Sequence, residues 1–186
     1  MVKAMLAMFL ATGVFGSFLA VDSLAVFTDQ KVNAANAFDT GSVSLTDAPA
    51  SALVTYANMA PGDSVISQLT LANAGTLELR YAMSTSATNV DTKALRDQLQ
   101  LTVRAKTVNP CANEDGAVLY GPAALSAGAT GSSAQGAQAG DRTVVAAASE
   151  DLCFKVALPL ATGNTFQTAS TTATFTFDVE QTKNNP

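Results

Sequence analysis

The sequence predicts an all-β protein, an antiparallel two-sheet β-sandwich of jelly-roll or immunoglobulin-like type. From residue 26 onward, short stretches rich in Val, Thr, Phe, Tyr and Leu alternate with Gly, Asn, Asp and Pro, without a βαβ pattern. The chain of 186 residues has room for one domain and a targeting segment. Because 48% of the residues are apolar and 13% are charged, the chain is expected to fold.

The amino terminus has the three parts of a secretory signal peptide. A positive residue precedes an apolar run over residues 4–21, and the small residues Ser23 and Ala25 follow. Residues 1–25 are therefore predicted to be a signal peptide that is cleaved before Val26. The run is also just long enough to span a bilayer, so a retained hydrophobic helix, as an anchor or buried in an assembly, is the alternative.

Three strands are predicted in the first half of the mature chain, at residues 41–45, 64–72 and 77–83. In each of them apolar residues recur at every second position, which is typical of a half-buried strand. Their inward-facing residues are expected to be Val43, Leu45, Leu69, Leu71, Leu77, Leu79, Tyr81 and Met83.

One short helix is predicted over residues 91–99, with Asp91 as its N-cap and Leu95 and Leu99 on one face. The β pattern then resumes, and the last two clear strands cover residues 152–158 and 174–179. The side chains expected to face inward from these two strands are Leu152, Phe154, Val156, Leu158, Phe175, Phe177 and Val179.

The two cysteines, Cys111 and Cys153, are predicted to form a disulfide, because exported cysteines usually pair and no His is present to complete a metal site. Two separately buried thiols are the alternative. Between them, residues 121–140 are almost all Ala, Gly, Ser and Gln. This segment is predicted to be an exposed loop insertion that the disulfide closes at its base.

The composition excludes several classes of function. The net charge of −5 provides no basic surface for nucleic acid. The absence of His excludes Ser-His-Asp, Cys-His and His-Glu-x-x-His chemistry, so we expect no catalytic residues, no zinc-dependent peptidase activity and no cofactor. The acidic pairs at 114–115 and 150–151 flank the cysteines, and we interpret them as solvated charges, with a calcium site as the alternative.

The chain resembles the TasA/camelysin (CalY-like) family of secreted biofilm-matrix proteins. The residues that carry the resemblance, in order, are 24–29 (LAVFTD), 36–45 (NAFDTGSVSL), 59–63 (MAPGD), 71–81 (LANAGTLELRY) and 174–182 (TFTFDVEQT). The order and spacing of these segments are more specific than any one of them. The cysteine-bounded segment and the two cysteines lie outside the family pattern.

The resemblance implies a jelly-roll sandwich, over residues 46–186, that is secreted to the extracellular space or cell surface. It also implies a structural role as a subunit of a biofilm-matrix filament, in which residues 26–45 serve as a donor-strand segment that completes a sheet of the next subunit. The expected partners are further copies of the chain and an accessory or anchoring fibre protein. Contact with a membrane is expected only through the amino-terminal segment before cleavage.

The predicted donor segment has apolar residues at one parity, interrupted by Gln30 and Asn36. The residues expected to face the neighbouring subunit are Val26, Thr28, Val32, Ala34 and Phe38. Two alternatives stay open: the segment is the first strand of its own subunit, or the protein is a monomeric adhesin or camelysin-like hydrolase.

Overall fold

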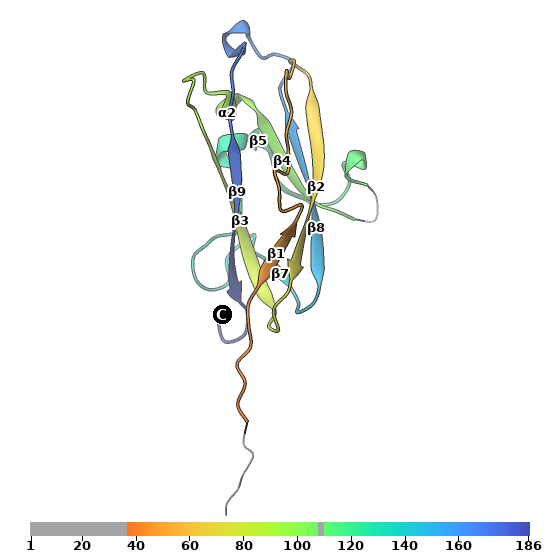
Figure 1. Cartoon of the computed structure of the whole chain (residues 1–186), viewed down its shortest axis with the longest axis vertical. Helices are drawn as coiled ribbons and strands as arrows, with labels where there is room; N and C mark the ends of the chain where they lie inside the picture. Colours follow the sequence, from red (N-terminus) through yellow and green to blue (C-terminus); the bar gives the residue numbers. More distant parts are fainter. Residues whose placement is uncertain (1–36, 108–109) are drawn as a thin grey trace, which may run out of the picture. The chain divides into compact units, whose positions relative to one another are not determined.

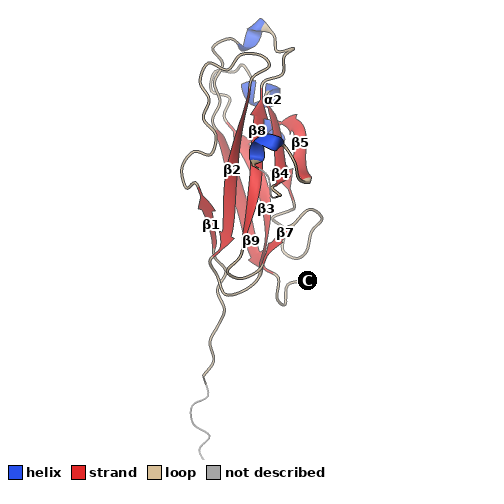
Figure 2. Ribbon diagram, turned by 90° about the vertical axis from the view of Figure 1, so that its right-hand side faces the viewer, coloured by secondary structure: helices blue, strands red, loops and turns tan. Residues whose placement is uncertain are grey.

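The computed structural model describes residues 37–107 and 110–186. The chain divides into two units, residues 1–38 and 39–186, and the second unit contains every strand described below. Strands form most of its regular structure, and helices are reduced to short turns (Figure 2). The described residues contain no helix long and apolar enough to cross a membrane. The predicted signal peptide and its cleavage site lie outside the described residues.

The larger sheet has five antiparallel strands in the order β1-β2-β8-β4-β5 (Figure 1). The bounds of its strands are Leu45–Ala48 (β1), Ser64–Asn73 (β2), Gln100–Ala105 (β4), Val118–Ala124 (β5) and Ser149–Ala157 (β8). The central pair is β2 and β8, which run in unbroken register from Ser64 opposite Ala157 to Ala72 opposite Ser149.

The smaller sheet is built around β3, which pairs with β9 along one side and with β6 and β7 along the other. The bounds of its strands are Leu79–Ala87 (β3), Ala129–Thr130 (β6), Arg142–Val144 (β7) and Ala173–Gln181 (β9). The helical turns are Leu95–Gln98 (α2), Cys111–Asn113 (η2), Leu125–Ala127 (η3) and Asn164–Phe166 (η4).

The core lies between the two sheets, which pack face to face. The predicted alternation is confirmed, because the residues of one parity in β2, β3, β4 and β8 are buried: Leu69, Leu71, Leu79, Tyr81, Met83, Leu101, Val103, Leu152, Phe154 and Val156. The ring of Phe154 in the larger sheet packs edge-on against Phe175 in β9, with centroids 4.9 Å apart. The two-sheet antiparallel architecture predicted from the alternation is therefore confirmed.

Strand β3 differs from its prediction as a half-buried strand, because Arg80 and Ala82 on its outer face are also buried. The Arg80 guanidinium pairs with Glu180 of β9 at 2.6 Å and donates a hydrogen bond to the carbonyl oxygen of Asn185. Gly131 also lies against this face, near Ala82. Contacts from segments distant in the sequence thus cover a face that the alternation predicts to be solvated.

The predicted helix is shorter than expected and begins at Leu95 rather than after Asp91. The Asp91 carboxylate accepts hydrogen bonds from the backbone N–H groups of Lys93 and Ser170, at 3.0 and 2.7 Å, so it stabilises a turn instead. The residue before the helix, Ala94, has a left-handed backbone with φ of 56°. Asp91 therefore does not cap the helix, because its carboxylate binds the backbone of Ser170, which is distant in the sequence.

The prediction of an exposed loop over residues 121–140 is wrong for its first half. This half contains most of β5, the turn η3 and the strand β6, and Leu125 is buried. A Cβ added at Gly128 would lie 2.7 Å from the Thr85 side chain, and the Gly128 carbonyl accepts the Thr85 N–H at 2.8 Å. Small residues are used here for close backbone approach, so the segment is ordered without large side chains.

Candidate functional site

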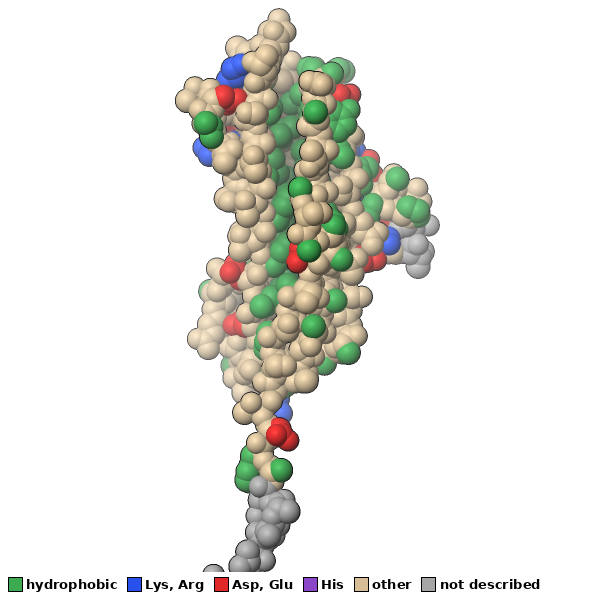
Figure 3. All heavy atoms as spheres, viewed as in Figure 1, with side chains coloured by type: hydrophobic (Ala, Val, Ile, Leu, Met, Phe, Trp, Pro, Cys, Tyr) green, Lys and Arg blue, Asp and Glu red, His purple; other side chains and the backbone are tan. Residues whose placement is uncertain are grey.

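The most distinctive surface feature of residues 39–186 is a groove between the edges of the two sheets. Strand β9 pairs with β3 on one side, and no described strand pairs with its other side. The groove lies along that free side and has a volume of about 490 Å³. Figure 3 shows it as a long hollow with hydrophobic atoms at its floor. We call this feature the edge groove.

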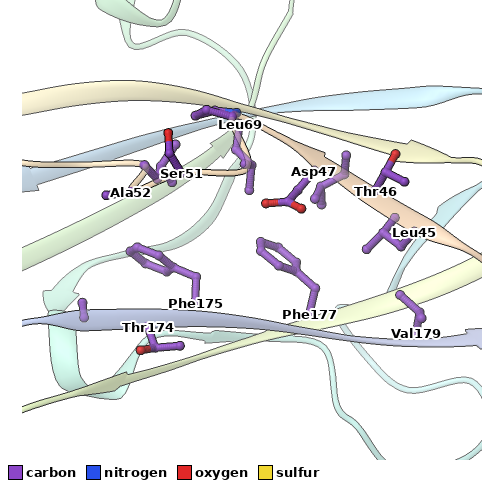
Figure 4. Close-up of a pocket in the computed structure, with 14 residues that line it drawn as sticks. Leu45, Thr46, Asp47, Ser51, Ala52, Leu69, Thr174, Phe175, Phe177 and Val179 are labelled. Atoms are coloured by element: carbon purple, nitrogen blue, oxygen red, sulfur yellow. The ribbon is translucent and has the colours of Figure 1, made fainter.

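Alternate residues of β9 and two leucines of β2 make the groove apolar. Phe175, Phe177 and Val179 project from β9 toward the opposite wall, where Leu69 lies (Figure 4). Phe177 also packs edge-on against buried Tyr81, with ring centroids 6.0 Å apart. Phe175 and Phe177 are half-buried and Val179 is 38% exposed, so part of their apolar surface remains in water.

The opposite wall consists of β1 and the segment that follows it. Strand β1 pairs with β2 from Leu45 opposite Asn73 to Ala48 opposite Thr70, and its other side pairs with no described strand. Ser51, Ala52 and Leu53 continue the wall beyond β1. Two unpaired strand edges therefore face one apolar hollow, an arrangement that exposes backbone N–H and C=O groups.

One charged residue projects into this groove. Asp47 has the same parity as Leu45, and its carboxylate points toward the ring of Phe177 (Figure 4). Within the described residues the Asp47 side chain has no hydrogen-bond or ion-pair partner. The edge groove therefore combines an apolar floor with one solvated carboxylate.

The acidic residue Glu150 of β8 is paired with a cation and a hydroxyl. Tyr81 donates a hydrogen bond to Glu150 at 2.6 Å, and Arg142 also pairs with Glu150. Burial, strengthened by Glu150, raises the pKa of Tyr81 far above its usual value. These three side chains link the two sheets, and the Tyr81 hydroxyl remains protonated.

The calcium alternative at the two acidic pairs gains no support from the geometry. Glu114 pairs with Lys155 at 2.5 Å, and Asp151 pairs with Lys106 at 3.2 Å. A hydrogen bond from the Thr70 hydroxyl, at 2.6 Å, and the Lys106 ammonium lower the pKa of Asp151. Among the described residues, no group of three or more Cys, Asp or Glu side chains is placed to hold a metal ion.

The predicted disulfide is confirmed. Cys111 and Cys153 are bonded, with Cα atoms 5.4 Å apart, and no other cysteine is present. The bond links the η2 turn to β8. Cys153 has the opposite parity to Leu152 and Phe154, so the bond lies on the other face of the strand from these two core residues. It lies outside the edge groove, whose lining includes neither cysteine.

The predicted donor residues are largely untested by the structure. Val26, Thr28, Val32 and Ala34 lie outside the described residues. Phe38 is described, and its side chain is 93% exposed. Phe175, Phe177 and Val179 were predicted to share one face, which the groove confirms, whereas Asp47 was not predicted to lie beside them. The sequence does carry a signal for its position, because Asp47 has the same parity as Val43 and Leu45 and is therefore expected on the same face.

Comparison with known families gives one match. The family model described as Camelysin metallo-endopeptidase matches residues 1–115 of the 186. The matched region contains β1, β2, β3 and β4, and it ends just after Cys111. Comparison with the curated proteins gives no match.

Proposed function

The chain belongs to the camelysin family, which includes TasA, and from this premise we propose that it is a structural subunit of an extracellular protein filament. The proposal includes secretion after removal of residues 1–25 and a location in the biofilm matrix. It also includes the jelly-roll connectivity that the resemblance implies.

One observation carries this proposal: the open edge of β9 lies beside an apolar groove. An added strand would pair with the free backbone groups of β9 and cover Phe175, Phe177 and Val179. Each apolar side chain that enters the groove contributes about 1–3 kcal/mol through the area removed from water. Several such residues give enough free energy to hold two subunits together.

We assign this strand to residues 26–34 of a neighbouring copy. Of the predicted donor residues they provide Val26, Thr28, Val32 and Ala34 at one parity, which matches the alternation of β9, and Phe38 would lie beyond the end of that strand. Repetition of one head-to-tail contact, without closure, produces a filament. Further copies of the chain are therefore the main partner, and an accessory fibre protein would end or anchor the filament.

The test is deletion of residues 26–34 in the secreted protein. We expect a folded, soluble subunit that no longer elongates, observed as loss of fibres under negative stain and elution near monomer size. Asp at Val26 and Val32 should have the same effect, because an unpaired carboxylate costs several kcal/mol in an apolar groove. Substitutions at exposed residues 132–135 serve as the control and should leave the fibres unchanged. Normal fibres from the deletion variant would refute the donor-strand assignment.

The peptidase function in the family's description is the second candidate. A catalytic zinc site uses three protein ligands from His, Glu, Asp and Cys, with His the commonest. This sequence has no His, its two cysteines form a disulfide, and Glu114, Glu150 and Asp151 pair with cations. The residues therefore do not fit such a zinc site.

We accordingly propose a non-enzymatic role, which chelation tests directly. Purified protein free of host proteases should not cleave casein, with or without added zinc. Cleavage that a chelator abolishes would restore the peptidase candidate. A monomeric adhesin would instead elute at monomer size with residues 26–34 intact, which separates it from a filament subunit.

A further inference from the structure

We propose that Asp47 sets the register of the incoming strand by accepting a hydrogen bond from the side-chain amide of Gln30 in the neighbouring copy. This inference rests on the proposed function, and it names the polar contact that would align the donor segment in the edge groove. It concerns the position of the strand, whereas the apolar residues supply most of the binding free energy.

The first argument is the placement of the carboxylate. Asp47 pairs opposite buried Leu71, and its side chain points into the groove toward Phe177 (Figure 4). Its neighbour of the same parity, Leu45, packs against the core. An inward-pointing charge on an edge strand disfavours unspecific strand addition, because an apolar strand would cover it.

The second argument is the cost of covering this carboxylate. In the subunit alone Asp47 is exposed and interacts with water. A strand that fills the groove removes that water, and within the described residues no other group donates to the Asp47 carboxylate. A buried charge without a donor costs several kcal/mol, so the incoming strand must supply the donor.

The third argument is the pattern of the donor segment. At the parity of Val26 and Val32, its apolar face is interrupted by Gln30, whose amide group carries two donors. Gln30 is the central residue of the segment 26–34, just as Phe177 is the central residue of β9. The part of the donor segment assigned to β9, residues 26–34, has the same nine-residue length as that strand. Full overlap of the two brings Gln30 to Phe177, where the Asp47 carboxylate points.

The two other polar candidates fit less well. Lys31 is the only cation in residues 26–38, but it has the opposite parity and would point away from the groove. Asn36 has the required parity, but aligning it with Asp47 would move Val26 and Thr28 beyond the end of β9 and lose their burial. Gln30 is the residue whose pairing keeps the apolar contacts and satisfies the carboxylate.

Cross-linking between copies tests the register. One preparation carries Val179→Cys, and the other carries Val26→Cys, Thr28→Cys, Val32→Cys or Ala34→Cys, so Asp47 and Gln30 stay in place. The native cysteines are bonded to each other and do not react. With Gln30 opposite Phe177, Val179 lies opposite Val32 in a parallel pairing and opposite Thr28 in an antiparallel one. After mixing with a short thiol-specific cross-linker, one of these two copies should give the most heterodimer, at least threefold more than any other position. A maximum at another position, or equal yields, would overturn the register.

A double-mutant cycle tests the hydrogen bond. Asp47→Leu and Gln30→Leu should each raise the protein concentration needed for fibre growth about tenfold, because each leaves one partner unsatisfied. The double variant should return to within about threefold of the unmodified protein. Lys31→Ala is the matched control and should change nothing. Additive losses in the double variant would contradict the contact.

The failures of the two proposals are distinguishable. If the unmodified secreted protein forms no fibres, the proposed function fails. If it forms fibres that require residues 26–34, but Asp47→Leu and Gln30→Leu have no effect, then the register inference alone is wrong.

Discussion

Two of the edge strands of this molecule, β9 and β5, differ in how readily they could pair with an additional strand. Strand β9 keeps unbroken register with β3 over its whole length and contains neither Pro nor Gly. Strand β5 contains Gly121 and Pro122, and its register with β4 shifts at two places. Gly121 has a φ of +79°, where a Cβ would lie against the Leu101 carbonyl oxygen.

This difference shows where strand addition is possible. Pro122 cannot donate a backbone hydrogen bond, and irregular register twists an edge away from a regular partner, so β5 is protected. Strand β9 has no such protection, and the edge groove adjoins it. An exposed regular edge is a liability for a monomer but a binding site for a filament subunit.

The largest expected effect compares the same substitution on the two edges. Val179→Asp on β9 should raise the concentration needed for fibre growth about a hundredfold or more, because the incoming strand would bury an unpaired carboxylate. Val118→Asp on β5 is the control, since Val118 is similarly exposed, 47% against 38%. Its effect should stay within about threefold. Equal loss of fibres in both variants, measured by sedimentation, would remove the distinction between the edges.

The next largest effect concerns the ion pair between Arg80 of β3 and Glu180 of β9. Arg80→Ala should lower the free energy of unfolding by about 3 kcal/mol, because Glu180 would lose a buried cation. Arg104→Ala, beside β5, should cost about 1 kcal/mol, because among the described residues the Arg104 guanidinium makes one hydrogen bond, to the Gly116 carbonyl oxygen at 3.1 Å. Urea unfolding of dilute monomer measures both, and a reversed order would contradict this account.

Removal of the disulfide should change stability without changing assembly. Closing a loop with a sequence separation of 42 predicts about 4 kcal/mol from chain entropy, and we expect a loss of about 2–4 kcal/mol in Cys111→Ala/Cys153→Ala. The bond lies outside the edge groove, so the folded double variant should still form fibres. Loss of fibres at temperatures where the variant is folded would link the disulfide to the interface.

The smallest effect is a pH dependence inside the five-stranded sheet. The pKa of Asp151 is lowered in the folded protein, so its stabilising contribution is present above the unfolded value of about 3.9 and is lost as the pH falls through the folded value. Asp151→Asn should therefore be less stable at pH 7, by about 1 kcal/mol or less because the side chain is partly exposed. The gap to the unmodified protein should close below about pH 4 in urea titrations.

Local alternation was sufficient to predict most of the strands and the face that each one buries. Leu69 and Leu71 in β2, and Phe154 and Val156 in β8, are buried as their parity requires. The helix prediction was less accurate because the Asp91 carboxylate accepts a hydrogen bond from the backbone of Ser170, which is distant in the sequence. A signal that depends on neighbouring residues fails where a distant segment competes for the same group.

The sequence by itself predicted most of the long strands from residue alternation and the pairing of Cys111 with Cys153 from the expected export, and it fixed the absence of His. The tertiary structure decided which strand edges stay open, that residues 121–130 are ordered, and that Asp47 points into an apolar groove. The physical reason is that alternation gives each strand two faces but not its neighbours. Whether an edge is paired, blocked or open depends on segments far apart in the chain meeting in space.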